Sequence, residues 1–419
     1  MFAPAVPAVI EEFDIHSSVI GPLMLSIYIL GWMMGPLVLA PLSEVHGRLA
    51  VYGWSSALYI CFTAVCALAP GAMALVVFRF LAGAVGSAPL TLGGGTISDL
   101  IPVRERGRAL SFYMVGPILG PAVGPLAGGY LTAAWGWRSI FWGLLGLYLG
   151  AAMAQMLIMR ETYAPAILTR KTARLRAEAR STQWQSKLNS GLTGRQVLAR
   201  AVMRPMKLTF LSPVNLFISL ASAYINGLLF LVVATLPLIF GREYGFGPKD
   251  VGIAFEGIGI GNLVGLAVFA LTSDRYIRAQ AEKGQLKPEH RLAPVVAAGP
   301  LLASGFFWYG WSAQLHAHWF VPIIGTSLIG MGNILFFSAI IGYLIDAFTT
   351  HVASAIAANI IIRSLGGTLL PLCGDLLYEN LGWGWGSSVL AFGVLLFTPG
   401  LLLLYTHGER IRERFRFEL

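Results

Sequence analysis

The sequence predicts an all-α polytopic membrane protein, first from its composition and then from its apolar segments. Hydrophobic residues make up 56% of the 419 residues and charged residues 12%, which is about half the charged fraction of soluble domains. Apolar stretches of about 20 residues, enough to cross a bilayer, recur along the whole chain. Eleven complete crossings are expected, near Ser18–Leu42, Val51–Ala69, Ala72–Ser98, Ala109–Leu131, Ile140–Met159, Phe210–Phe240, Val251–Leu271, Leu292–Trp311, Trp319–Ile345, Val352–Leu372 and Gly384–Tyr405.

The positions of the basic residues predict the topology of these crossings. Of the 29 Lys and Arg residues, 24 fall in the tail and in loops on one side, whereas only Arg138, Arg242 and Lys249 fall in the opposite loops. Cytoplasmic loops of membrane proteins carry such an excess. The net charge of +9 therefore indicates orientation, and no nucleic-acid partner is expected. The long central loop and the C-terminus are expected in the cytoplasm.

The chain is expected to form two bundles of helices separated by one polar stretch. We expect an N-terminal bundle over residues 1–159, a cytoplasmic loop over 160–209, a C-terminal bundle of six helices over 210–405 and a cytoplasmic tail over 406–419. Met1–Ile10 supplies about half a crossing, so the first helix is expected to be incomplete. This segment lacks the basic start and the long apolar core of a signal peptide. The three cysteines lie in or beside crossings and predict no disulfide framework.

One expected crossing is rich in glycine and proline, and its pattern predicts a bending helix with close neighbours. Small residues four apart let another helix approach closely, and prolines remove backbone donors and loosen the helix. A static packing helix is the alternative interpretation. The pattern consists of Gly120, Gly124, Pro125, Gly128 and Gly129.

This pattern resembles the fifth-helix motif of exporters in the major facilitator superfamily, and other segments extend the resemblance over nearly the whole chain. Ala40–Arg48 is similar to the loop motif between the second and third helices, and Arg79–Gly83 to the fourth-helix motif. Glu161–Pro165 is similar to the same region of fungal drug:proton antiporters with twelve spans. The resemblance implies the major facilitator fold, with two pseudo-symmetric six-helix bundles of which the first lacks most of its first helix, and transport by alternating access.

Charged residues at the expected cytoplasmic helix ends are interpreted as gating residues, together with the five residues of the fifth-helix motif. Such charges can pair when the inner side is closed and separate when it opens. A wet pair contributes about 1 kcal/mol or less, and the alternative is a set of solvated loop charges. These candidates are Glu44, Gly47, Arg48, Asp99, Arg108, Asp274, Arg275 and Asp346.

Three charged residues fall well inside crossings and are candidates for substrate or proton binding. Arg79 and Arg363 each need a partner or a wet cavity, and because arginine keeps its charge, they can hold an anion or a carbonyl but cannot carry the proton. Structural arginines bound to backbone carbonyls are the alternative. Glu256 is the one acid well within a crossing, where ionisation is penalised. It is expected to carry the proton or to attract a cationic substrate, unless it is a water-exposed residue near the outer end.

Polar and aromatic residues in the second half are expected to line a central cavity. Aromatic walls with sparse hydrogen-bonding groups suit bulky, mostly apolar ligands, although single aromatics in membrane helices also face lipid or the core. The candidates are Asn215, Tyr224, Asn226, Asn333, Phe336, Phe337 and Asn359.

The function expected from these features is proton-coupled efflux of small lipophilic compounds such as drugs or a fungal secondary metabolite. A nutrient importer is the second interpretation, although Arg160–Ala164 stands where sugar porters carry a Pro-Glu-Ser-Pro-Arg-like segment. A membrane enzyme is not expected, because clustered His boxes, Asp-Asp-x-x-Asp and Gly-x-Ser-x-Gly are missing from the sequence. A non-functional truncated transporter is a further alternative.

The expected partners are the substrate, protons and the lipid bilayer. His316 and His318 have no third ligand nearby in the sequence, so no metal is expected, and neither is a cofactor. The protein is expected to be a monomer in the plasma membrane, with the vacuolar membrane as the alternative location.

Overall fold

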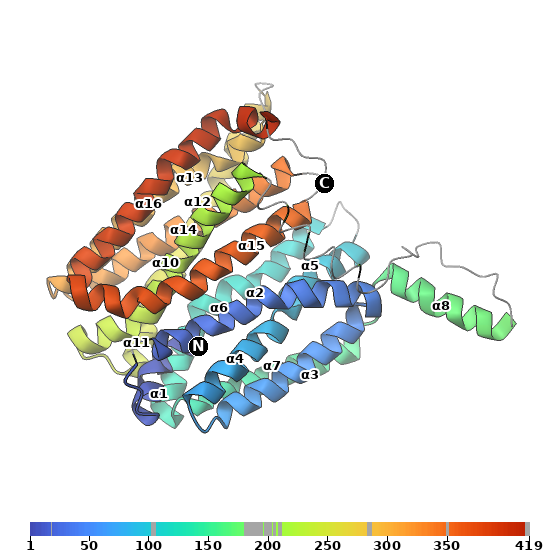
Figure 1. Cartoon of the computed structure of the whole chain (residues 1–419), viewed down its shortest axis with the longest axis horizontal. Helices are drawn as coiled ribbons and strands as arrows, with labels where there is room; N and C mark the ends of the chain where they lie inside the picture. Colours follow the sequence, from blue (N-terminus) through green and yellow to red (C-terminus); the bar gives the residue numbers. More distant parts are fainter. Residues whose placement is uncertain are drawn as a thin grey trace. The chain divides into compact units, whose positions relative to one another are not determined.

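A computed structural model describes residues 1–17, 19–101, 106–179, 212–282, 287–348 and 352–414, together with 196, 203 and 207. In these residues the regular structure is helical throughout (Figure 1). The short elements are η1 (Ala3–Ala5), α1 (Val6–Glu12), α11 (Pro248–Ala254), η2 (Pro288–Leu292) and η3 (Leu370–Cys373). The long helices are α2 (Ile20–His46), α3 (Arg48–Ala67), α4 (Ala72–Gly86), α5 (Ala88–Leu100), α6 (Arg106–Trp135), α7 (Arg138–Ile158), α8 (Ala164–Ala179), α10 (Pro213–Tyr244), α12 (Glu256–Glu282), α13 (Ala293–Gln314), α14 (Phe320–Ala347), α15 (Val352–Leu369) and α16 (Gly374–Arg414).

Each of the eleven expected crossings coincides with one helix or with consecutive helices, which confirms the all-α polytopic fold class. Within the described residues, nine segments are long and apolar enough to cross a membrane. The last of them, Ala355–Arg412, contains the final two expected crossings. The crossing expected over Ala109–Leu131 lies in α6, which is not among the nine but has 30 residues, enough for about 45 Å of helix.

One expected crossing is interrupted within its length, and a second break separates the last two crossings, as the local sequences favour. The crossing over 72–100 is divided at Ser87, and the next helix has Pro89 at its second position, where the missing backbone donor costs nothing. Helix α16 is broken at Gly382, whose φ of 71° lies in a region that favours glycine. The breaks let one apolar segment change direction inside the bundle.

The chain divides into two compact units, each described here by itself. One unit comprises residues 1–26, 117–140 and 205–419, and the other comprises 27–116 and 141–204. We call them the large and the small unit. The division into bundles at residues 160–209 stays a prediction from the sequence.

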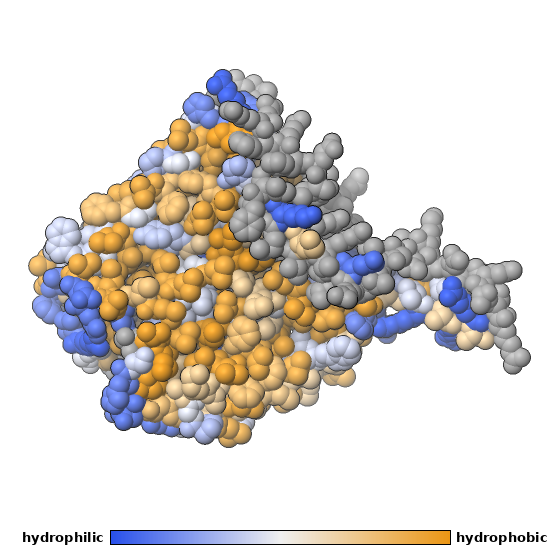
Figure 2. All heavy atoms as spheres, viewed as in Figure 1, coloured by the Kyte–Doolittle hydropathy of each residue, from blue (hydrophilic) through white to orange (hydrophobic). Residues whose placement is uncertain are grey.

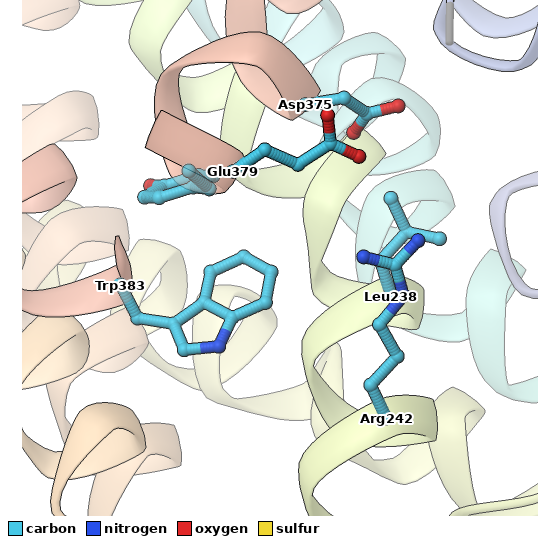
Figure 3. A pocket seen from close by; sticks show the side chains of 6 residues that line it. Leu238, Arg242, Asp375, Glu379 and Trp383 are labelled. Carbon is cyan, nitrogen blue, oxygen red and sulfur yellow. The ribbon is translucent and has the colours of Figure 1, made fainter. Parts of the chain in front are cut away.

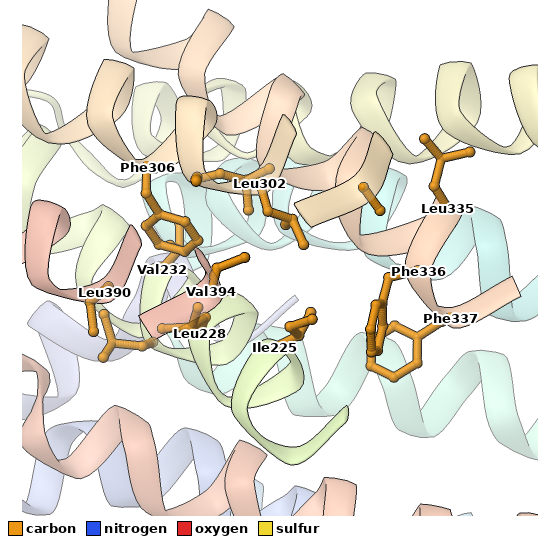
Figure 4. Close-up of a cluster of buried hydrophobic side chains, with 14 of the residues drawn as sticks. Ile225, Leu228, Val232, Leu302, Phe306, Leu335, Phe336, Phe337, Leu390 and Val394 are labelled. Carbon is orange, nitrogen blue, oxygen red and sulfur yellow. The ribbon is translucent and has the colours of Figure 1, made fainter. Parts of the chain in front are cut away.

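The large unit is a layered bundle in which α13 packs against α14 and α16, α12 against α14, and α10 against α15 (Figure 1). Figure 4 shows its apolar core, to which α10 contributes Ile225 and Val232 and α13 contributes Phe306. Glycines let these helices approach closely. A β-carbon at Gly325 would lie 2.7 Å from the backbone nitrogen of Tyr309, a separation that only glycine allows.

Hydrophobic side chains also cover most of the face shown in Figure 2, as expected for helices that contact lipid acyl chains. Leu157, Ile158 and Leu396 are each about four-fifths exposed, at 87%, 82% and 79%. In water such a surface would drive aggregation, whereas in a bilayer it contacts the lipid acyl chains. The chain is therefore a multi-pass membrane protein.

In the large unit, an ion pair fastens the N-terminal segment to the start of α7. The Glu12 carboxylate accepts hydrogen bonds from the Arg138 guanidinium and, at 2.6 Å, from the indole Nε1 of Trp137. These bonds lower the pKa of Glu12 below its ordinary value of 4.5, and the bond from Arg138 has the larger effect. The stability contributed by Glu12 is therefore present above that ordinary value and is lost as pH falls through the lowered one.

We expect Glu12→Gln to lower the free energy of unfolding at pH 7 by about 1 kcal/mol or less, because the pair is partly exposed. Thermal unfolding in detergent, measured at pH 7 and in steps down to a pH below the lowered pKa of Glu12, shows the effect, and the difference from wild type should vanish at the acidic end. The matched control is Glu11→Gln, because Glu11 is exposed and has no ion pair within the described residues. A difference that persists at the acidic pH would contradict the assigned pairing.

Candidate functional site

Arg48, at the start of α3 in the small unit, is the centre of a polar cluster. Its Nε lies 3.4 Å from a carboxylate oxygen of Asp99, and its Nη1 donates a 2.9 Å hydrogen bond to Ser43 Oγ. The guanidinium carbon lies 5.2 Å from the ring centroid of Tyr163. The side chains of Arg48 and Asp99 are only 14% and 21% exposed, so their ion pair is less screened than a surface pair.

The carboxylate of Glu161, which follows α7, binds the beginning of α3 in the small unit. It accepts hydrogen bonds from the backbone N–H groups of Arg48 and Leu49, at 2.9 and 3.3 Å, and from those of Thr162 and Tyr163, at 3.1 and 3.0 Å. The first N–H groups of a helix have no partner within the helix, and a negative charge is favourable at that end. Glu161 thus caps α3 from a distance of 112 residues or more in the sequence.

Gly47 is required by this arrangement for two reasons. Its φ of +94° lies in the region that favours glycine, and a β-carbon would overlap the Oε2 atom of Glu161. The sequence motif therefore specifies a turn that brings the N-terminus of α3 against a carboxylate. The sequence pattern alone assigned no site role to Glu161. Its position directly after a predicted crossing could have indicated a role at a helix end.

The remaining gating candidates are placed differently. Glu44 is exposed and forms no ion pair within the described residues, and Arg275 is exposed. The side chains of Arg108 and Asp274 lie outside the described residues. Asp346 accepts a 2.8 Å bond from Arg291 Nε at the end of α14. Their gating roles stay predictions.

The glycines of α6 make close contacts within the large unit. A β-carbon at Gly128 would overlap the carbonyl oxygen of Met1, and one at Gly124 would lie 3.1 Å from the Met1 nitrogen. A β-carbon at Gly129 would lie 2.5 Å from the carbonyl oxygen of Pro248 in α11. Pro125 is buried beside them, whereas no described atom lies within 4 Å of a β-carbon built at Gly120. Part of the motif is thus a packing surface for Met1 and α11.

Arg79 lies in α4 of the small unit, with 8% of its surface exposed. Its guanidinium carbon is 5.5 Å from the ring centroid of Tyr28 and 5.9 Å from that of Phe141. Aromatic faces attract a guanidinium through the ring quadrupole. The surroundings are compatible with either a structural or a ligand-binding arginine.

Arg363 lies in α15 of the large unit, with its guanidinium carbon 4.8 Å from the ring centroid of Phe337. The Phe337 and Phe336 rings are nearly perpendicular, with centroids 5.4 Å apart (Figure 4). Asn226 Nδ2 donates a 3.2 Å hydrogen bond to the backbone oxygen of Arg363. The structure therefore brings together three of the predicted cavity residues and the charged candidate Arg363.

The other candidates in the large unit are separate. Tyr224 donates to the backbone oxygen of Leu390, and Asn359 donates to Ser222 Oγ, each at 3.0 Å, so both link helices. Glu256 begins α12, and its Oε1 atom is buried without a hydrogen-bond partner. Both polar side-chain atoms of Asn215 and the Oδ1 atom of Asn333 are likewise buried without a partner.

A small pocket also opens in the large unit, at the end of α10 (Figure 3). Asp375 and Glu379 from α16 face Arg242 from α10, and Trp383 lies beside them. Its volume of about 110 Å³ is below the 300–1,000 Å³ typical of sites for drug-sized ligands. The pocket therefore does not hold a bulky substrate. Nearby, His316 Nδ1 lies 3.2 Å from Glu243, and the described residues contain no group of three or more metal-binding side chains.

Comparison with known proteins identifies transporters as relatives. The family model of the Major Facilitator Superfamily matches residues 1–371. The MFS-type transporter hepF of Aspergillus oryzae is 45% identical over 424 residues, which cover 100% of this chain and 86% of hepF. The efflux pump radE of Floropilus chiversii is 42% identical over 424 residues, covering 100% of this chain and 78% of radE.

Solved structures agree on the fold. The xylose transporter XylE from E. coli, in a partially occluded inward-open conformation, has a TM-score of 0.70 and 14% sequence identity. The match covers 97% of this chain and 93% of that chain. At this identity the likeness concerns the fold alone, and the substrate of XylE has no bearing on this chain.

Proposed function

Because the chain belongs to the major facilitator superfamily, and is thus a membrane transporter of small molecules, we propose that it exports small lipophilic compounds in exchange for protons. The observation that carries the proposal is the glycine-proline pattern of α6, together with a relative at 42% identity that is named an efflux pump. Alternating access of two helix bundles around a mid-membrane site is the proposed mechanism. The proposed location is the plasma membrane, and the proposed state is a monomer.

The large unit offers Glu256 as the proton carrier. Its buried, unpartnered Oε1 atom lies in an apolar segment, where a carboxyl group gains by taking up a proton. Protonation from the outer side and release to the cytoplasm would couple substrate exit to proton entry. Asp346 is less suited to this role, because Arg291 already neutralises it.

Inside-out plasma-membrane vesicles from yeast cells that express the full chain test the proposal. Addition of ATP makes the vesicle interior acidic through the endogenous proton pump. We expect pyrenebutyrate or its neutral amide to accumulate in these vesicles, and a protonophore to abolish the accumulation. Vesicles from cells with an empty vector are the control. Gradient-driven loss of both probes would indicate an importer, and no difference from the vector would indicate a non-transporting protein.

We expect Glu256→Gln to lose at least tenfold in gradient-driven accumulation while exchange of labelled for unlabelled probe continues without a gradient. The amide keeps the shape of the carboxyl group but cannot release a proton. The matched control is Asp250→Asn, which removes an exposed acid in the first turn of α11. Unchanged gradient dependence in Glu256→Gln would exclude Glu256 as the proton carrier.

A further inference from the structure

Arg363 is a cation without a counter-ion in the described part of the large unit. Its Nε atom is buried and has no hydrogen-bond partner, and no described acidic oxygen lies within the 4.0 Å limit for an ion pair. Two acids elsewhere in the unit already have basic partners: Asp346 pairs with Arg291, and Glu289 with Arg412. A guanidinium inside a membrane span is costly without a partner.

The surroundings of Arg363 suit an organic ligand more than a structural role. The face of Phe337 contacts the guanidinium carbon. It cannot accept hydrogen bonds from the N–H groups at the edge of the planar guanidinium. The side chain as a whole is half-buried, so part of it is accessible to a ligand. Phe337 adds apolar surface directly beside the charge, and the buried ring of Phe336 packs against it.

The backbone that carries Arg363 is held firmly. The Asn226 amide donates to the Arg363 carbonyl oxygen, and one turn further along α15 a β-carbon at Gly366 would overlap the carbonyl oxygen of Ala223 in α10. A β-carbon at Gly227 would lie 2.7 Å from the Gly366 carbonyl oxygen. This close helix contact fixes the backbone from which the Arg363 side chain extends, and the planar guanidinium fork matches the geometry of a carboxylate.

We propose that Arg363 binds an acidic group of the exported compound, so that the substrates are lipophilic organic acids. The inference rests on the proposed export function and specifies its substrate class. A carboxylate accepts two parallel hydrogen bonds from the guanidinium fork, while the apolar body of the substrate lies beside Phe337. Arg363 thus selects for negative charge, and a cationic compound of the same shape is disfavoured.

Binding to the full chain in phosphatidylcholine nanodiscs tests the proposal with three pyrene probes of matched shape: pyrenebutyrate, its neutral amide and pyrenebutylamine. We expect wild-type protein to bind the acid at least about tenfold more tightly than the amide, and the amine more weakly than the amide. Arg363→Gln should lose this preference, with acid binding reduced to the level of the amide. Arg363→Lys, which keeps the charge but not the fork, should keep part of the preference.

Two controls accompany these binding measurements. Amide binding that is unchanged in Arg363→Gln shows that the variant is folded, and Arg410→Gln, which removes an exposed arginine, should bind all three probes like wild type. Equal binding of acid and amide by wild type, or an acid preference that survives in Arg363→Gln, would overturn the proposal. Because binding is measured without transport, acid-selective binding without vesicle accumulation would reject the export function alone.

Discussion

Gly128→Val is expected to reduce export at least tenfold and to destabilise the large unit. The valine side chain would overlap the backbone carbonyl of Met1, and a backbone segment cannot rotate out of the way as a flexible side chain can. Overpacking of this kind typically costs about 1–3 kcal/mol. Either Met1 would separate from α6, or α6 would shift away from α11, and both changes disturb the packing of the large unit. Vesicle accumulation and thermal unfolding in detergent measure the two effects.

The matched control for this prediction lies on the same helix. Gly116→Val adds the same side chain to α6 at an exposed position where no described atom lies within 4 Å of a β-carbon. Because valine has a higher helix propensity than glycine, this variant should be as stable as wild type. Normal export by Gly128→Val, or equal losses in both variants, would show that close packing at Gly128 is not what the motif requires.

The crossings could be predicted from the sequence because hydropathy is a local property that accumulates along one helix. The expected crossing over 319–345, for example, begins one residue before α14, which spans residues 320–347. The break at Ser87 was not predicted, because glycines and prolines recur in these helices and only the packing selects which of them interrupts the helix. Gly382, in contrast, lies between the predicted crossings Val352–Leu372 and Gly384–Tyr405. The arrangement of the helices came from the resemblance to a family, since hydropathy contains no information about neighbours.

The candidate site was predicted less completely, because its partners are distant in the sequence. Arg48 and Asp99, which form an ion pair, were both predicted as charged residues at cytoplasmic helix ends. Glu161 was not among those predicted residues, although its carboxylate accepts four backbone hydrogen bonds. Arg363 was recognised as a buried charge, whereas its contact with Phe337 depends on how α14 and α15 pack. Periodicity cannot reveal such contacts.

Glu161→Ala is expected to have the second large effect, with export reduced at least tenfold and the small unit destabilised by about 1–3 kcal/mol. The substitution leaves the N–H groups of Arg48 and Leu49 without their acceptor at the start of α3, and an unsatisfied donor costs its full desolvation penalty. Arg48 would also lose the fixed backbone that aligns its side chain with Asp99. Glu161→Gln keeps one acceptor oxygen and should be intermediate.

The contrast with Glu44 makes this prediction specific to the capping arrangement. Glu44→Ala removes an acid from the same sequence motif, but one that is exposed and has no ion pair within the described residues, so its stability should match wild type. Thermal unfolding and vesicle accumulation of the three variants give the order expected from the structure: Glu44→Ala, then Glu161→Gln, then Glu161→Ala, from mildest to most severe. The reverse order would mean that Glu44 carries the function of the motif, because a solvated charge would then matter more than the carboxylate that caps α3.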